Sequence, residues 1–233
     1  MSENPPDMKL WIAAIEAKFA NKGEPFVRAD WDQLLGHCQA ITDQPCVMFY
    51  KELLEVYPDA KVILTMRDSA DQWARSALNT FTDFYLNMVA PQTTLYGRIR
   101  ERLAPLNPLL HTFIDVLFTH FPMTQALVHD RKQGLSAASK RYYEDYADEI
   151  KRIVPADKLL VMNVKQGWAP LCEFLGHEVP LYPFPRCNEM AEFRRNAGGI
   201  EGMLDGQVRS KLFRLGGAVA VLLVGLLVAV YRL

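Results

Sequence analysis

Two patterns of apolar positions alternate along the chain, one with helical spacing and one with short runs rich in Val, Leu and Ile. Aromatic and aliphatic side chains recur every four residues from Trp11 to Phe19, which predicts an amphipathic helix over residues 8–20. The short runs lie at residues 62–64 and 158–164. Such runs are typical of strands in a parallel sheet that helices cover on both faces.

The remaining segments show mainly helical spacing. Trp31, Leu34, Leu35 and Cys38 share one predicted helical face, and Ala40 and Ile41 form a very short extended piece. Helices are also predicted from Pro45 to Tyr57, over 70–90 and over 136–154, where Tyr142, Tyr146 and Ile150 lie on one stripe. Prolines at 91, 105, 108 and 122 interrupt apolar helical pieces, which favours a helical lid at about 91–134. Residues 1–196 therefore form one predicted α/β domain with many helices.

Arg67 and Asp68 come directly after the first predicted strand. In open α/β sheets, ligands bind beyond the carboxyl ends of the strands, and helix N-termini there favour anions. Arg67 is therefore a candidate ligand for a phosphate or sulfate group. The alternative is an Arg-Asp pair that only fixes the turn, while Ser69 caps the next helix. The pattern leaves both interpretations open.

Charge and cysteine content narrow the classes of partner. The chain has 26 basic and 27 acidic residues and a net charge of -1, so no global charge attracts nucleic acid, and an anion site must be local. A small-molecule substrate is the expected partner. The four cysteines form no CxxC pair, which favours reduced thiols over disulfides or a zinc site.

Residues 215–231 contain no charge and lie between Arg214 and Arg232. As a helix they would span roughly 25 Å, enough for a thin bilayer such as that of the endoplasmic reticulum. A buried core helix is the alternative. The basic residues before this segment predict that the main domain faces the cytosol, with residues 197–214 as a linker. Gly216 and Ala220 have the small-xxx-small spacing that allows a homodimer. The N-terminus lacks the pattern of a signal peptide.

Three further polar residues are candidates for chemistry. Asp43 follows a short predicted strand and could act as a general base, although a carboxylate that fixes the turn before Pro45 is an equal alternative. Lys165 follows the second strand, where it either faces the same site or is solvated. Arg186 lies on a proline-rich return and could close over an anionic ligand or tether its loop. The histidines show no metal-ligand spacing.

Four blocks occur in a defined order: DQP at 43–45, FYKELLEVYPDAKVILTMRD at 49–68 with Trp73 and Ser76 after it, KLLVMNVKQGWAPLCEFLG at 158–176, and PFPRCNE at 183–189. Over residues 11–193 the series resembles the P-loop sulfotransferase-like family common in fungi. The resemblance implies a fold similar to nucleotide kinases and the transfer of sulfate from 3′-phosphoadenosine 5′-phosphosulfate. It also implies that Arg67 and Ser76 hold the 3′-phosphate of that cofactor. The interval between them is one residue longer than the family form, so Ser69 is a substitute for Ser76.

The sequence departs from the family at its beginning. Family members usually start with a strand and a glycine-rich loop that cradles the 5′-phosphosulfate, and no such loop precedes Met8. Either the sequence is truncated, or the protein is a repurposed member. The expected function is sulfate transfer to a lipophilic acceptor in secondary metabolism. The alternatives are a non-sulfating biosynthetic step, such as dehydration or cyclisation, and a non-catalytic membrane-tethered scaffold.

Overall fold

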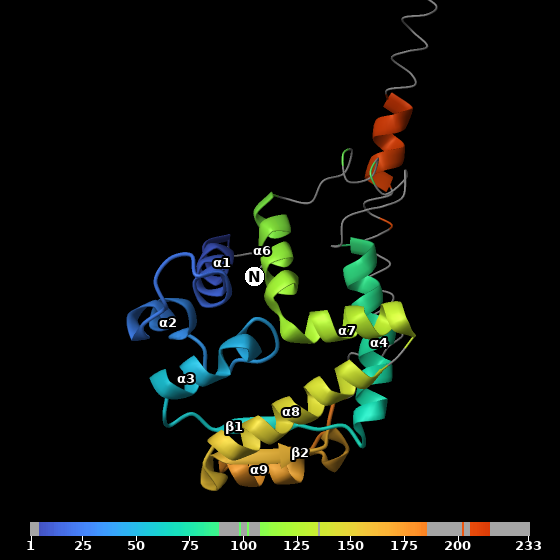
Figure 1. Cartoon of the computed structure of the whole chain (residues 1–233). Helices are drawn as coiled ribbons and strands as arrows, with labels where there is room; N and C mark the ends of the chain where they lie inside the picture. Colours follow the sequence, from blue (N-terminus) through green and yellow to red (C-terminus); the bar gives the residue numbers. More distant parts are fainter. Residues whose placement is uncertain are drawn as a thin grey trace, which may run out of the picture.

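A computed structural model describes residues 5–88, 98, 102, 108–134, 136–185, 202 and 206–214. In these residues helices predominate and the sheet is small (Figure 1). The elements are α1 (Pro5–Ala20), α2 (Arg28–Leu35), η1 (Cys46–Phe49), α3 (Tyr50–Val56), β1 (Val62–Thr65), α4 (Ala70–Met88), α6 (Pro108–His120), α7 (Pro122–Gln133), α8 (Ala137–Ile153), η2 (Ala156–Lys158), β2 (Leu159–Met162), η3 (Val164–Gln166) and α9 (Trp168–Leu175), with a helix at 206–214.

The larger hydrophobic core joins the N-terminal helices to α6. Its centre is an aromatic cluster in which the Trp31 ring lies 5.1 Å from Phe49 and 6.0 Å from Trp11. Ile15 from α1 and Leu117 from α6 are buried in the same core. The spacing that predicted the first two helices is confirmed, because the buried side chains of α1 and α2 recur at helical intervals.

β1 and β2 form a parallel pair, which confirms the predicted α/β class with a parallel sheet. The register aligns Val62 with Leu159 and Thr65 with Met162. Between the two strands the chain passes through α4, α6, α7 and α8 (Figure 1). A smaller core forms where Leu64 packs against Ala147 and Ile150 of α8, so the predicted apolar stripe of that helix is also confirmed.

The prediction that helices cover both faces of the strands is wrong. Ile63 is 39% exposed and Val161 is 42% exposed. Helix α8 packs on the face that contains Leu64, and the eight-residue helix α9 packs on β2, where Met162 is buried. Two helices, each packed mainly on one strand, leave one large hydrophobic residue of each strand open to solvent.

Two smaller expectations also change. Ala40 and Ile41 form no strand, because their loop is exposed and lies beside no other strand in the described residues. Cys38 is exposed, since α2 ends at Leu35 and the predicted helical face does not continue to it. The segment predicted as a helical lid contains α6, which packs against α1 and belongs to the larger core, and its role as a lid stays a prediction.

The C-terminal prediction concerns a part of the chain that the structure does not describe. Residues 206–214, at the end of the predicted linker, form a helix that lies far from the sheet (Figure 1). None of the described helices is long and apolar enough to cross a membrane. The predicted span at 215–231 lies outside the described residues, so it stays a prediction.

Candidate functional site

The turn after β1 is held by the second strand and by α8. The Met66 N–H donates to the Met162 carbonyl at 2.8 Å, which extends the strand pairing by one residue. The Arg67 N–H then donates to the Tyr143 hydroxyl at 2.8 Å. The Tyr143 ring stacks on Trp73, with ring centroids 5.0 Å apart and an interplanar angle of 23°. Arg67 is therefore fixed through its backbone by α8 and α4 together.

Asp68 connects this turn to the turn after β2. One carboxylate oxygen accepts a hydrogen bond from Asn163 Nδ2 at 2.9 Å, and the other accepts from Lys165 Nζ in an ion pair. The Lys165 hydrogen bond is the main cause of a pKa of Asp68 below its ordinary value, and Asn163 and Arg67 lower it further. Asn163 also accepts the Lys165 N–H at 3.0 Å, so the lysine loop is ordered by the same residue.

The N-terminus of α4 begins at the same place. The Ser69 hydroxyl accepts the Gln72 N–H at 3.2 Å, and the Gln72 side chain accepts the Asp68 N–H at 3.3 Å. This reciprocal arrangement satisfies backbone donors of the first turn. An ion pair of 2.9 Å between Lys140 and Asp71 attaches α8 to the same turn. Capping by Ser69, which the sequence offered as the structural alternative, is confirmed.

The Arg67 side chain is exposed, and its guanidinium makes no hydrogen bond or ion pair with any described residue. Its backbone is fixed while its five N–H donors remain open to solvent. A helix N-terminus two residues away adds a partial positive charge. The two interpretations of the turn are thus compatible, because Asp68 and Ser69 hold the turn and leave the arginine available to an anion.

Ser76 is half-buried and lies two turns into α4. Its carbonyl accepts the Thr80 hydroxyl at 2.7 Å, and no described contact joins it to Arg67. The rise of an α-helix places it about 10 Å along the axis from Ser69. A ligand that reaches both Arg67 and Ser76 must therefore extend along α4.

Asp43 lies in the exposed loop between α2 and η1. Its carboxylate accepts the N–H of Gln44 at 2.7 Å, its carbonyl accepts the Val47 N–H at 3.1 Å, and its φ of 61° is in the left-handed region. These are the contacts of a turn residue. The loop leads into η1 and the larger core, and no described contact brings Asp43 to Arg67.

The sequence indicated some of the residues that surround Arg67 and gave no indication of others. Lys165 does face the turn of Arg67, through Asp68. Arg186 lies outside the described residues. Tyr143 and Asn163 were not anticipated. The position of Asn163, directly after a strand, was an available signal, whereas nothing in the local sequence of α8 marks Tyr143 as a partner of Arg67.

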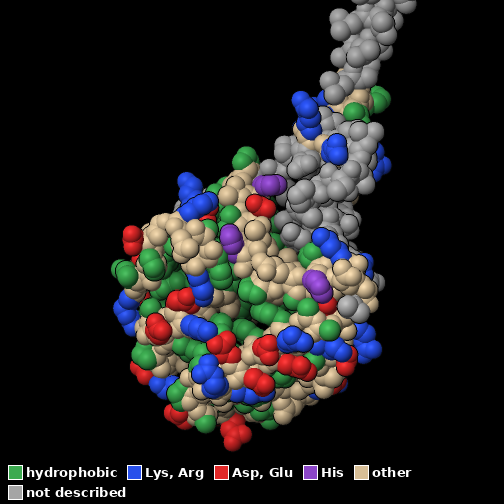
Figure 2. All heavy atoms as spheres, viewed as in Figure 1, with side chains coloured by type: hydrophobic (Ala, Val, Ile, Leu, Met, Phe, Trp, Pro, Cys, Tyr) green, Lys and Arg blue, Asp and Glu red, His purple; other side chains and the backbone are tan. Residues whose placement is uncertain are grey.

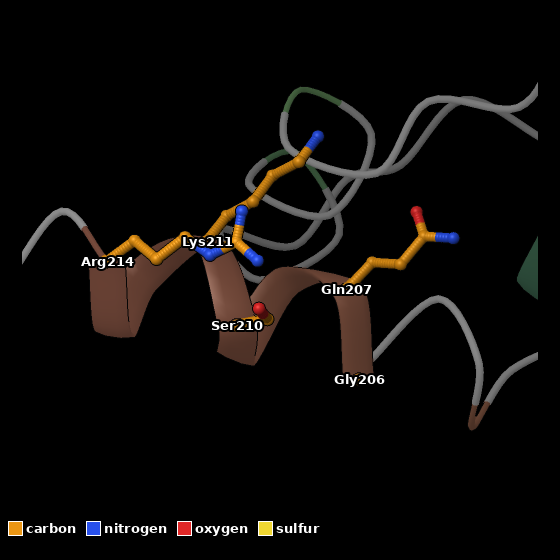
Figure 3. A pocket seen from close by; sticks show the side chains of 5 residues that line it. All are labelled: Gly206, Gln207, Ser210, Lys211 and Arg214. Carbon is orange, nitrogen blue, oxygen red and sulfur yellow. The ribbon is translucent and has the colours of Figure 1, made fainter.

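Charges of both signs are interspersed over the lower half of the face shown in Figure 2. In the described residues no group of three His, Cys, Asp or Glu side chains could hold a metal ion. The described residues that line a hollow of about 430 Å³ all belong to the helix 206–214, namely Gly206, Gln207, Ser210, Lys211 and Arg214 (Figure 3). Because all of these residues belong to one helix far from β1, the hollow adds nothing to the site at Arg67.

A family model described as a sulfotransferase domain matches residues 1–193. The chain belongs to this family. The resemblance seen in the sequence blocks is thereby confirmed at the level of the sulfotransferase domain. The chain is also 36% identical over 183 residues to Ava biosynthesis cluster protein M from Aspergillus versicolor. That match covers 78% of this chain and 66% of the relative. The chain thus spans just under two thirds of the length of the relative it matches.

Proposed function

We propose that this protein is a sulfotransferase-like enzyme of small-molecule secondary metabolism, which transfers sulfate from 3′-phosphoadenosine 5′-phosphosulfate to a lipophilic acceptor. The observation that carries the proposal concerns Arg67. Its backbone N–H donates to the Tyr143 hydroxyl at 2.8 Å, while its guanidinium makes no hydrogen bond or ion pair with a described residue. The family to which the chain belongs and the name of its fungal relative support the same assignment.

The residues at the strand ends fit one part of this cofactor. An exposed arginine beside a helix N-terminus offers charged donors to a phosphate, and charge-assisted hydrogen bonds of this kind are the strong ones. Arg67 would hold the 3′-phosphate, with a hydroxyl from Ser76 or from Ser69. Arg186 would close over the anionic ligand. The cofactor itself supplies the activated sulfuryl group, within a P-loop-like fold.

The structure gives less support to the residue that would activate the acceptor hydroxyl than to the cofactor ligands. A general base must reach hydrogen-bond distance of the acceptor hydroxyl. Asp43 could serve in this role only if the acceptor extends to the loop between α2 and η1, because no described contact joins that loop to the turn of Arg67. Its role in the turn is the competing assignment.

A second candidate function is a non-sulfating step, such as dehydration or cyclisation, by a repurposed member of the family. The observation that favours it is the sequence after each strand, since neither β1 nor β2 of the described residues leads into a glycine-rich phosphate loop. Loss of the donors that stabilise the departing charge would cost far more than one donor, which is typically worth about 3–4 kcal/mol. A non-catalytic membrane-tethered scaffold is the third candidate.

We also propose that residues 215–231 anchor the chain in a membrane with its main domain facing the cytosol, and that a homodimer forms through the same segment. The support is the uncharged sequence between two arginines. Carbonate extraction of membranes tests it, because a chain that ends after Arg214 should be released while the full chain stays in the pellet.

Isothermal titration calorimetry of the full chain with 3′-phosphoadenosine 5′-phosphate tests the proposed cofactor. We expect binding that weakens by about 100-fold or more in Arg67→Ala, because a bidentate phosphate contact is lost. Lys61→Ala is the matched control, since Lys61 lies before β1 and its Nζ donates to the Phe174 carbonyl at 2.6 Å. Absence of binding by the unchanged chain would overturn the proposal. Mass analysis of products then separates sulfate transfer from a step that adds no sulfate.

A further inference from the structure

The β1–β2 pair carries a lysine-aspartate ion pair at each end, and the two differ in the donors that they leave open. We propose that Lys165 is a second cation that binds the phosphate held by Arg67, and that Asp68 positions Lys165 for this contact. The inference rests on the proposed function, because it concerns the same anion site.

Strand pairing brings the two cations to one edge of the sheet. Thr65 pairs with Met162 at the last step of the register. Arg67 follows Thr65 by two residues, and Lys165 follows Met162 by three. Carboxyl ends of parallel strands meet at the same edge, which is where ligands of open α/β sheets bind. Both cations therefore project from neighbouring loops at that edge.

Asp68 lies between the two cations. It bonds to Lys165 through one carboxylate oxygen and to Asn163 through the other, and it is the residue that directly follows Arg67. Both cations also lower the pKa of its carboxyl, which indicates that both act on the same small region. Two positive charges and one negative charge leave this region with a net positive charge for an anion.

The Lys165 ammonium keeps N–H donors that no described residue uses. An ammonium group has three N–H donors, and in the described residues Asp68 takes one of those of Lys165, while the side chain is 68% exposed. A phosphate beside Arg67 can therefore accept from Lys165 without displacing Asp68. Asp68 orients the lysine, which lessens the rotamer entropy that an unpaired lysine would lose on binding.

The opposite ion pair does not offer the same opportunity. Lys158 donates to the Pro58 carbonyl at 2.8 Å and to Asp59 at 3.2 Å, so two of its three donors are already used, and its side chain is only 32% exposed. It joins the strands at their amino ends. Lys158 is therefore a matched control, because it is also a lysine in a loop next to β2 and is also paired with an aspartate.

The experiment titrates 3′-phosphoadenosine 5′-phosphate into the full-length chain and into Lys165→Met, Lys165→Arg and Lys158→Met, at several salt concentrations. We expect Lys165→Met to bind about tenfold more weakly, with a smaller loss of affinity as salt rises, because one screened charge contact is missing. Lys165→Arg should retain most of the affinity. Lys158→Met should match the unchanged chain in affinity and in salt dependence.

The outcomes separate the two ideas. If the unchanged chain binds and Lys165→Met has the same affinity, Lys165 is not a ligand and only this inference is overturned. The same holds if Lys165→Met weakens binding but leaves the salt dependence intact, since a merely structural lysine would act in that way. If the unchanged chain does not bind, the proposed function and the inference fall together. Circular dichroism of each variant shows that the fold is retained.

Discussion

Each end of the β1–β2 pair carries a lysine-aspartate ion pair, but only the carboxyl end also has an arginine with open hydrogen-bond donors. At the amino end, Lys158 bonds to Asp59 and to the Pro58 carbonyl. At the carboxyl end, Asp68 bonds to Lys165 and Asn163, and Arg67 beside it keeps a free guanidinium among the described residues. An ion pair that joins two strand ends is therefore not by itself a sign of a site. The number of donors left open after folding distinguishes the two ends.

The direction of the helices strengthens this difference. Helices α3 and α8 finish just before the strands, so their carbonyl ends and partial negative charge lie at the amino end of the sheet. Helix α4 begins just after β1, so its N–H groups lie at the carboxyl end. An anion is therefore favoured at one end and disfavoured at the other. Variants that weaken the support of the carboxyl end, or that remove one of its contacts, test this difference.

The largest effect on stability is expected from Asp130, a fully buried carboxylate that anchors the start of α8. It accepts the N–H and the hydroxyl of Ser139, both at 2.7 Å, and the Ala138 N–H at 3.2 Å. Asp130→Ala leaves these buried donors unpaired, so we expect the free energy of unfolding to fall by about 2–4 kcal/mol. Urea unfolding monitored by tryptophan fluorescence measures the change.

Asp145→Ala is the control for Asp130, because Asp145 is an exposed carboxylate of α8, the helix whose start Asp130 of α7 anchors. A loss of comparable size in both variants would show that α8 needs negative charge in general and not the cap at its start. Helix α8 carries Tyr143 and Lys140, which contact the turn of Arg67 and the first turn of α4. Asp130→Ala should therefore loosen the carboxyl end of the sheet more than its amino end.

The same carboxylate predicts a dependence of stability on pH. Burial raises the pKa of Asp130, but the hydrogen bonds from Ser139 and Ala138 outweigh it, so the pKa lies below the ordinary value of 3.8. The carboxylate therefore adds stability above that value, and the added stability disappears as the pH falls through the folded pKa. Urea midpoints from about pH 6 to about pH 2.5 should fall less steeply for Asp130→Asn than for the unchanged chain. Parallel curves would contradict this assignment.

The sequence predicted the helices and strands better than it predicted which of their faces are covered. The helical stripes of α1, α2 and α8 and both strands follow from periodicity, because each pattern spans residues close together in the chain. Exposure of Ile63 and Val161 did not follow, since the same apolar run suits a strand with one covered face or two. Coverage depends on how α8 and α9 pack, which local spacing does not encode.

The candidate site shows the same division. Arg67 is a candidate because its position after a strand is visible in the sequence, and the capping by Ser69 was visible as well. The partner of the Arg67 backbone, Tyr143, lies 76 residues away on α8 and contacts it only through tertiary packing. Asp43 looked equally suitable in sequence, but the fold places it in a turn next to the larger core. Proximity between distant loops is the information that the sequence pattern lacks.

The smallest effect is expected from removing one hydroxyl at each end. Tyr143→Phe keeps the stack on Trp73 but loses the acceptor of the Arg67 N–H, a bond typically worth about 1 kcal/mol. Amide hydrogen exchange at Arg67 should therefore become about fivefold faster, a change that mass spectrometry or NMR measures. Tyr57→Phe is the counterpart at the amino end, where the Tyr57 hydroxyl donates to Asp32 at 2.8 Å. It should leave Arg67 exchange unchanged. Equal acceleration in both variants would mean that the two ends loosen together, and the carboxyl end would then have no separate support.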